Sequence, residues 1–191
     1  MIGIAGPPGA GKSTLLATLA TLRRPRTGTL EIFGCEAGRS AELRPLRARI
    51  GYLPADARWG GGSTVHDFVS YAAYYQRRPS SSVRSVLAGL ELGDVAEQPL
   101  DRLPPDLRVR AGLAAACVHE PDLALLDEPL AGLSYGAAAD LTPLLATVAP
   151  TVVVTAADPA DLLGWCDQVF LLNRGHLTER LPEGTRMLAC V

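Results

Sequence analysis

The sequence lacks the features that mark secreted, membrane-spanning and nucleic-acid-binding chains. No apolar run approaches the roughly 18 residues that a membrane helix needs, and the residues after Met1 lack the basic segment of a signal peptide. The 18 basic and 20 acidic residues leave a net charge of −2 without a long run of one sign, so no patch of charge favours a polyanion. We therefore expect a chain that is neither secreted nor inserted in a membrane and that binds no nucleic acid.

Cysteine and lysine are both scarce. The four cysteines, Cys35, Cys117, Cys166 and Cys190, are scattered without a C-x-x-C pair. This predicts small buried hydrophobic residues in a reducing cytoplasm rather than disulfides or a metal site. Of the 18 basic residues 17 are arginine, and Lys12 is the single lysine. Because a compact ammonium and a guanidinium fork are not interchangeable, Lys12 is a candidate functional residue.

The length of 191 residues and the hydrophobic fraction of 48% suit one domain that needs no disulfide or metal to fold. Short apolar runs at Ile2–Ala5, Ile50–Leu53, Leu123–Leu126 and Thr151–Thr155 predict buried strands, and helical patterns separate them. This alternation predicts an α/β fold in which helices flank a mainly parallel sheet. The stretch Thr64–Leu90 has helical patterns but no strand, which predicts a lobe on one side of the sheet.

Within that lobe, the T-x-x-D pattern at Thr64 predicts a capping box that begins a helix ending near Gln76. In this helix Tyr71, Tyr74 and Tyr75 have i, i+3, i+4 spacing. That spacing predicts the apolar, buried face of the helix rather than a platform for stacking bases.

The segment Gly6–Thr14 satisfies G-x-x-x-x-G-K-[ST] between a predicted strand and a predicted helix. Glycines let backbone N–H groups point inward around a phosphate, and the helix N-terminus adds partial positive charge. We expect Lys12 to reach the β- and γ-phosphates, Ser13 to bind Mg²⁺ and Thr14 to bond the α-phosphate. The predicted nucleotide-binding residues are Gly6, Gly9, Ala10, Gly11, Lys12, Ser13 and Thr14.

Two acidic residues follow the buried run Leu123–Leu126, where open α/β sheets place their ligands. Asp127 is predicted to hold Mg²⁺ together with Ser13, and Glu128 is the candidate catalytic residue that polarises an attacking water as general base. The alternative is a pair of acids that cap a helix beginning after Pro129. The phosphate loop in the same chain favours the nucleotide site.

The order and spacing of these blocks resemble the ATP-binding subunits of ABC transporters over nearly the whole chain. Besides Gly6–Thr14 and Leu123–Pro129, the segment Ile50–Pro54 resembles the strand before the family's glutamine loop. Leu103–Ala114 resembles the start of its signature helix, and Thr151–Asp158 the strand that carries its switch histidine.

This resemblance implies a P-loop NTPase fold of the ABC type as a single domain over residues 1–191, with a helical subdomain at about 56–110. It implies ATP and Mg²⁺ as ligands. It also implies two partners, a membrane permease subunit and a second ATP-binding subunit, and a peripheral position on the cytoplasmic face of the cell membrane.

Four positions depart from the family's pattern. Ala55 stands at the glutamine, Pro104–Leu107 at Ser-Gly-Gly-Gln of the signature, Ser134 at the aspartate of the next loop, and Ala157 at the switch histidine. In the family, the signature segment binds the γ-phosphate held by a partner domain, but prolines lack an N–H and Asp106 adds a carboxylate. No strand with an aromatic residue precedes the phosphate loop, so adenine stacking is also expected to be lost.

We therefore predict a degenerate subunit that binds Mg²⁺–ATP and hydrolyses it weakly, or only with a partner that supplies the missing groups. A non-catalytic, ATP-gated regulatory or docking module is the alternative: Ala157 favours it, whereas Glu128 favours hydrolysis. A small P-loop kinase is less favoured, since the sequence shows no arginine-rich lid beside an acceptor base. The transported substrate, the direction of transport and the oligomeric state stay open.

Overall fold

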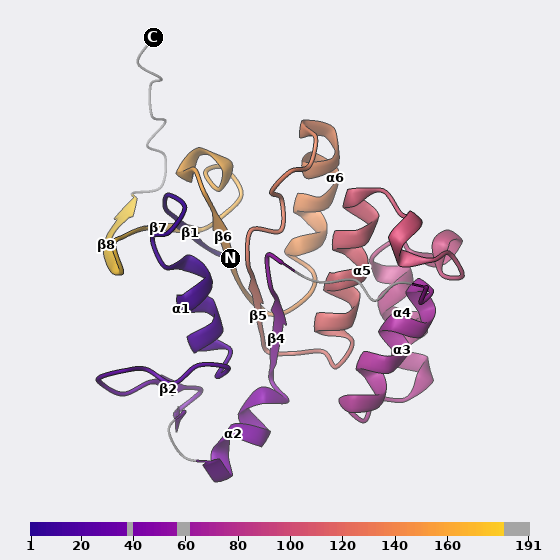
Figure 1. Ribbon diagram of the computed structural model, residues 1–191, viewed down its shortest axis with the longest axis horizontal. Helices are drawn as coiled ribbons and strands as arrows, with labels where there is room; N and C mark the ends of the chain where they lie inside the picture. Colours follow the sequence, from indigo (N-terminus) through magenta and orange to yellow (C-terminus); the bar gives the residue numbers. More distant parts are fainter. Residues whose placement is uncertain (38–39, 57–61, 182–191) are drawn as a thin grey trace.

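Figure 1 shows a computed structural model of the chain that describes residues 1–37, 40–56 and 62–181. A six-stranded sheet in the order β4-β5-β6-β1-β7-β8 forms its centre. Neighbouring strands are parallel except β7 and β8, which form an antiparallel hairpin. The prediction of an α/β fold with a mainly parallel sheet is confirmed. The strands are β1 (Ile2–Ala5), β4 (Ile50–Leu53), β5 (Leu123–Leu126), β6 (Thr151–Ala156), β7 (Gln168–Asn173) and β8 (His176–Leu181).

Helices cover both faces of this sheet (Figure 1). Helix α1 lies on one face, α5 and α6 lie on the other, and α3 and α4 pack beside α5, farther from the sheet. Helix α2 contacts β4 and the small β2–β3 hairpin. Within the described ranges, no helix has the length and hydropathy of a membrane span. The bounds are α1 (Lys12–Leu19), β2 (Glu31–Ile32), β3 (Cys35–Glu36), α2 (Ser40–Arg47), α3 (Val65–Tyr75), α4 (Ser80–Gly89), α5 (Pro105–Cys117) and α6 (Tyr135–Leu145).

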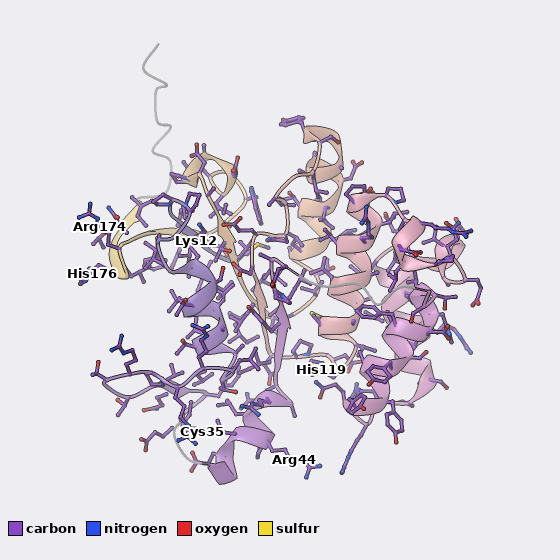
Figure 2. All side chains as sticks on the ribbon, in the orientation of Figure 1. Lys12, Cys35, Arg44, His119, Arg174 and His176 are labelled. Carbon is purple, nitrogen blue, oxygen red and sulfur yellow. The ribbon has the colours of Figure 1, made fainter. Side chains whose placement is uncertain are left out.

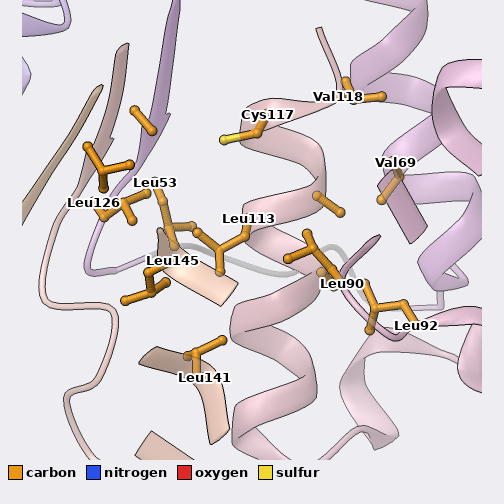
Figure 3. Close-up of a cluster of buried hydrophobic side chains, with 14 of the residues drawn as sticks. Leu53, Val69, Leu90, Leu92, Leu113, Cys117, Val118, Leu126, Leu141 and Leu145 are labelled. Carbon is orange, nitrogen blue, oxygen red and sulfur yellow. The ribbon is translucent and has the colours of Figure 1, made fainter. Parts of the chain in front are cut away.

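Alternation along the central strands gives the domain two hydrophobic cores. In β5, Ala124 and Leu126 belong to the core under α3–α6, whereas Leu125 belongs to the core under α1. Successive side chains of a strand point to opposite faces, so a strand covered on both sides is a continuous apolar run. Figure 3 shows the larger core, in which Leu113 of α5 and Leu145 of α6 pack toward the sheet.

The predicted start of α3 is confirmed, but the predicted buried face is wrong. Thr64 Oγ1 accepts a hydrogen bond from the Asp67 backbone N–H at 3.0 Å. Tyr71, Tyr74 and Tyr75 are instead 65%, 76% and 65% exposed. The buried residues of α3 are Val65, Val69 and Ala73, whose smaller side chains let α3 pack closely against its helical neighbours.

The cysteines follow their prediction only in part. Cys117 is buried, Cys35 and Cys166 are half-buried, and all three are free thiols. Burial raises the pKa of Cys117 to about 12 and that of Cys166 to about 11, which keeps both thiols protonated at neutral pH. Cys190 lies outside the described residues.

Gly51 in β4 lets the end of α5 lie directly against the sheet. A Cβ at this position would stand 2.6 Å from the backbone O of Ala116. We expect Gly51→Ala to lower the free energy of unfolding by about 1–3 kcal/mol through overpacking. Gly136 in α6 meets no atom within 4 Å, so Gly136→Ala should raise the same quantity by up to about 1 kcal/mol. Urea unfolding measures both variants, and equal effects would contradict the close packing at Gly51.

Candidate functional site

The strand register brings three chain segments to one edge of the sheet. Strand β6 lies between β1 and β5, with Ala5 opposite Ala156 and Leu126 opposite Val154. The segment Gly6–Thr14 therefore leaves β1 on one side of β6, and the two acidic residues leave β5 on its other side. This carboxyl edge is where open α/β sheets bind ligands.

The phosphate loop has the conformation that its glycines predict. Gly9 and Gly11 have φ values of 80° and 104°, and nothing lies within 4 Å of a Cβ built on either. A side chain at Gly6 would instead meet the backbone O of Leu172 at 2.2 Å. The loop therefore has open space where it curves and a tight fit where it leaves the sheet, so its shape depends on glycine at both places.

The phosphate loop is anchored by the β7–β8 turn and leads into α1. The Gly175 N–H of the β7–β8 turn donates to the carbonyl of Ala10 at 3.0 Å. Ser13 and Thr14 lie in the first turn of α1 and are exposed. Their hydroxyls and the first N–H groups of the helix are thus accessible to an anion. The structure gathers all seven predicted nucleotide-binding residues in this loop and helix start.

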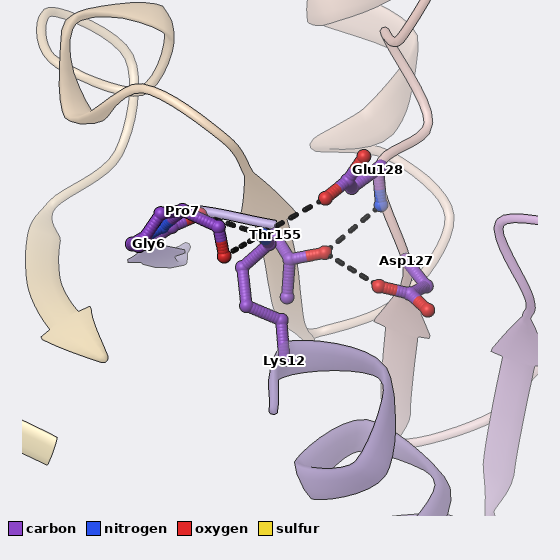
Figure 4. A network of polar contacts seen from close by, with 6 residues as sticks. All are labelled: Gly6, Pro7, Lys12, Asp127, Glu128 and Thr155. Atoms are coloured by element: carbon purple, nitrogen blue, oxygen red, sulfur yellow. Dashed lines mark hydrogen bonds and ion pairs between the residues drawn. The ribbon is translucent and has the colours of Figure 1, made fainter. Parts of the chain in front are cut away.

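Lys12 is a buried cation at the centre of the site (Figure 4). Its side chain is 4% exposed. Nζ donates to the carbonyl of Gly6 at 2.6 Å and to that of Pro7 at 3.4 Å, and pairs with Glu128 Oε1 at 3.0 Å. An ammonium this deeply placed needs negative partners, and here the candidate catalytic carboxylate is one of them.

Asp127 and Glu128 are joined through Thr155, a residue that sequence reasoning missed. Asp127 is 2% and Thr155 1% exposed. Thr155 Oγ1 donates to Asp127 Oδ1 at 2.8 Å and accepts from the Glu128 backbone N–H at 2.9 Å (Figure 4). Glu128 has a φ of 49°, a left-handed conformation that is uncommon outside glycine and typical of functional sites. In the sequence, the role of Thr155 was indicated only by its place as a polar residue near the end of an apolar strand.

The negative charge of Asp127 also acts on Tyr52 of the neighbouring strand β4. Burial, followed by the negative charges of Asp127 and Asp56, raises the pKa of the Tyr52 phenol, and Arg23 opposes the shift. The phenol therefore stays neutral.

These residues fit a magnesium–nucleotide complex. Space is open beside Gly9 and Gly11, and the Lys12 ammonium is a buried positive charge. The Asp127 carboxylate and the Ser13 hydroxyl carry oxygen atoms of the kind that Mg²⁺ prefers, so these two residues would hold the ion. The chemistry that such an ion supplies is neutralisation of phosphate charge.

A cavity of about 320 Å³ adjoins Glu128. Its walls include Ala55 after β4 and Arg108 of α5, together with Asp127 and Glu128. Ala55, the position of the family's glutamine, thus faces the same space as the candidate general base. A larger cavity of about 620 Å³ lies between α4 and the segments that precede β5 and β6, at the opposite edge of the sheet.

Two of the other departures from the family pattern lie at the starts of helices. Pro104 precedes the first turn of α5, which contains Asp106. Ser134 caps α6 by accepting a hydrogen bond from a backbone N–H at 3.3 Å. Ala157 is exposed. His119 does not replace a histidine at Ala157, because its Nε2 lies 3.2 Å from the carbonyl of Ile50 at the start of β4, and Figure 2 shows it well away from Lys12.

Comparison with known proteins gives consistent matches. A family model described as ABC transporter matches residues 1–131. The phosphonates import ATP-binding protein of Anaeromyxobacter dehalogenans is 34% identical over 98% of this chain and 41% of its own length. The sulfate/thiosulfate import ATP-binding protein of Mycolicibacterium paratuberculosis is 31% identical over 94% of this chain and 51% of its own length. The chain therefore spans about half, or less, of these relatives.

Solved structures share the fold. The cbiO1 protein from Clostridium perfringens, part of the ABC transporter complex cbiONQ, aligns with a TM-score of 0.83 at 24% identity over 94% of this chain and 75% of that chain. A dimeric, post-hydrolysis state of the ATP-binding cassette MJ0796, bound to ADP and Pi, also aligns with a TM-score of 0.83, at 22% identity over 95% of this chain and 84% of that chain.

Proposed function

The chain belongs to the ABC transporter family, and from this premise we propose that it is an ATP-binding subunit that binds Mg²⁺–ATP at Gly6–Thr14, Asp127 and Glu128. The observation that carries the proposal is the buried Lys12 ammonium, whose Nζ lies 3.0 Å from Glu128 Oε1 at the mouth of the phosphate loop. A buried ammonium paired with a half-exposed carboxylate can exchange that carboxylate for a phosphate. The proposal also rests on the open space around Gly9 and Gly11.

Each residue of the site has a distinct role in this proposal. The N–H groups of the loop and of the first turn of α1 bind phosphate oxygens, and Lys12 turns from Glu128 to the terminal phosphates. Ser13 and Asp127 hold the magnesium ion. Glu128, released from Lys12, orients a water and accepts its proton as general base.

We propose that hydrolysis by this chain alone is slow. Removing one preorganised donor to developing charge costs about 10²–10³ in rate, and three such groups are replaced here, at Ala55, at Ala157 and in the signature segment. Their losses need not add, because catalytic groups act as a unit. A partner subunit with an intact signature would supply one of them.

We also propose the partners and the subdomain that the family implies. Two relatives are import ATP-binding proteins, which supports a membrane permease subunit and a second ATP-binding subunit as partners on the cytoplasmic face of a membrane. The helical subdomain proposed at about 56–110 comprises α3, α4 and the start of α5, since these helices pack on one another. Residues 57–61 of this range lie outside the described chain.

A second candidate is a regulatory or docking module that binds ATP without hydrolysing it. The observation that favours it is the cavity beside Glu128, whose wall at Ala55 offers a methyl group where the family places an amide. Turnover in the presence of a family member with an intact signature separates the two: hydrolysis that Glu128→Gln abolishes supports the first candidate, and its absence supports the second.

Thermal unfolding tests nucleotide binding. At an ATP concentration of 100 times Kd, binding stabilises the folded state by about 2.7 kcal/mol, which raises Tm by about 5–10 °C in a domain of this size. We expect this shift with ATP and Mg²⁺, and a shift below about 2 °C with AMP, because the loop and Lys12 bind the phosphates that AMP lacks. Equal shifts with ATP and AMP would contradict the proposed role of the loop.

A further inference from the structure

Thr155 stands on the strand between the two halves of the site. Strand β6 separates the phosphate loop after β1 from the acidic residues after β5, and Thr155 is opposite Ile4 of β1 one residue before both strands end. Its side chain is 1% exposed, in a strand whose other buried residues are valines. A buried hydroxyl in such a strand is costly unless it is fully hydrogen-bonded.

Thr155 uses its hydroxyl both as a hydrogen-bond donor and as an acceptor. A threonine hydroxyl has one donor and two acceptor positions. Oγ1 donates to Asp127 Oδ1 at 2.8 Å and accepts from the Glu128 N–H at 2.9 Å. Donation to Asp127 Oδ1 fixes that oxygen, so Oδ2 is the oxygen left for a metal ion or its bound water.

The second hydrogen bond acts on the backbone of Glu128. This residue has a φ of 49°, a conformation that persists only where its surroundings hold it. Acceptance of the Glu128 N–H by Thr155 supports that conformation, and the Glu128 side chain then reaches Lys12 Nζ at 3.0 Å. One hydroxyl thus constrains the metal-binding carboxylate and the candidate general base together.

We propose that Thr155 is a positioning residue for the magnesium ion: it acts through Asp127 and Glu128 and touches neither nucleotide nor metal. The inference rests on the proposed function, since it names how the proposed magnesium ligand is oriented. Partners of metal ligands typically contribute 10–100-fold to metal affinity. The contribution should therefore appear in the magnesium dependence of nucleotide binding and not in binding without the metal.

The test uses Thr155→Val, which keeps the shape and the β-branch but removes both hydrogen bonds, and Thr155→Ser, which keeps the hydroxyl. Thr151→Val is the matched control, because Thr151 is exposed at the start of the same strand. Titration calorimetry measures ATP binding by the full chain in EDTA and at a series of Mg²⁺ concentrations. Amide hydrogen exchange of Glu128 in the nucleotide-free protein reads the second hydrogen bond directly.

We expect Thr155→Val to need at least about tenfold more Mg²⁺ for half-maximal ATP binding, with affinity in EDTA within about twofold of wild type. Its Glu128 amide should exchange at least about tenfold faster. Thr155→Ser and Thr151→Val should stay within about threefold of wild type in both measurements. If Thr155→Val left the magnesium dependence of ATP binding unchanged, the role of Thr155 would be overturned, but the proposed function would stand. Equal losses of ATP affinity with and without Mg²⁺ would have the same consequence. A wild-type chain that binds no ATP would instead overturn the proposed function.

Discussion

The Lys12→Ala variant is expected to bind ATP at least about 100-fold more weakly than the wild-type chain. A hydrogen bond to a charged group contributes about 1.5–3 kcal/mol. The Lys12 side chain is 4% exposed, and without its positive charge the site would place the carboxylates of Asp127 and Glu128 beside a negatively charged polyphosphate. Removing it leaves Glu128, 3.0 Å away, to repel the nucleotide. Calorimetric titration of Mg²⁺–ATP measures the loss.

The control for this variant is Arg84→Ala, which removes an equal charge from the exposed side of α4. Its Kd should stay within about twofold of wild type, because exposed charges at a distance are screened. Lys12→Arg should behave like Lys12→Ala, since a guanidinium does not fit the place of a buried ammonium that donates at 2.6 Å to the Gly6 carbonyl. A Lys12→Ala variant that binds ATP with wild-type affinity would contradict the proposed role of the phosphate loop.

Restoring the groups that the family uses is expected to increase ATP turnover by at least about 100-fold. The reason is that preorganised donors to the transferring phosphate contribute about 10²–10³ each, while Lys12, Asp127 and Glu128 are already in place. Steady-state phosphate release measures the rate. The restoring substitutions are Ala55→Gln, Pro104→Ser, Pro105→Gly, Asp106→Gly, Leu107→Gln and Ala157→His.

Two controls belong to this experiment. Adding Glu128→Gln to the restored chain should return turnover to the wild-type level, since the general base is then gone. A second control replaces Ala157→His with Ala160→His, which places the same side chain at another exposed position in the following turn. This chain should lack the part of the increase in ATP turnover that the histidine at position 157 contributes. A wild-type chain that already hydrolyses ATP as fast as the restored one would contradict the proposed loss at Pro104–Leu107.

The features that the sequence predicted correctly are local or periodic. The run Leu123–Leu126 is buried on both faces, and Thr64 caps α3 as its T-x-x-D pattern requires. The phosphate loop depends on glycines within a few residues of one another, so its spacing alone predicts its conformation. Family membership followed from the order of such blocks.

The features that the sequence missed depend on contacts between distant segments or on competing patterns. Thr155 meets Asp127 and Glu128 only because β6 is inserted between β1 and β5. Helix α2 contains Pro45, which masks the helical pattern although the helix forms. In α3 two faces share helical spacing, and packing against other helices buries the valines rather than the larger tyrosines.

The central claim is that this chain holds a triphosphate with its own loop and its one lysine. Calorimetry on the purified chain with Mg²⁺ tests it most directly. We expect saturable binding of one ATP per chain, weakened at least about 100-fold by Lys12→Ala. Absence of binding to the wild-type chain, both by direct heat and by competition with a fluorescent ATP analogue, would contradict it.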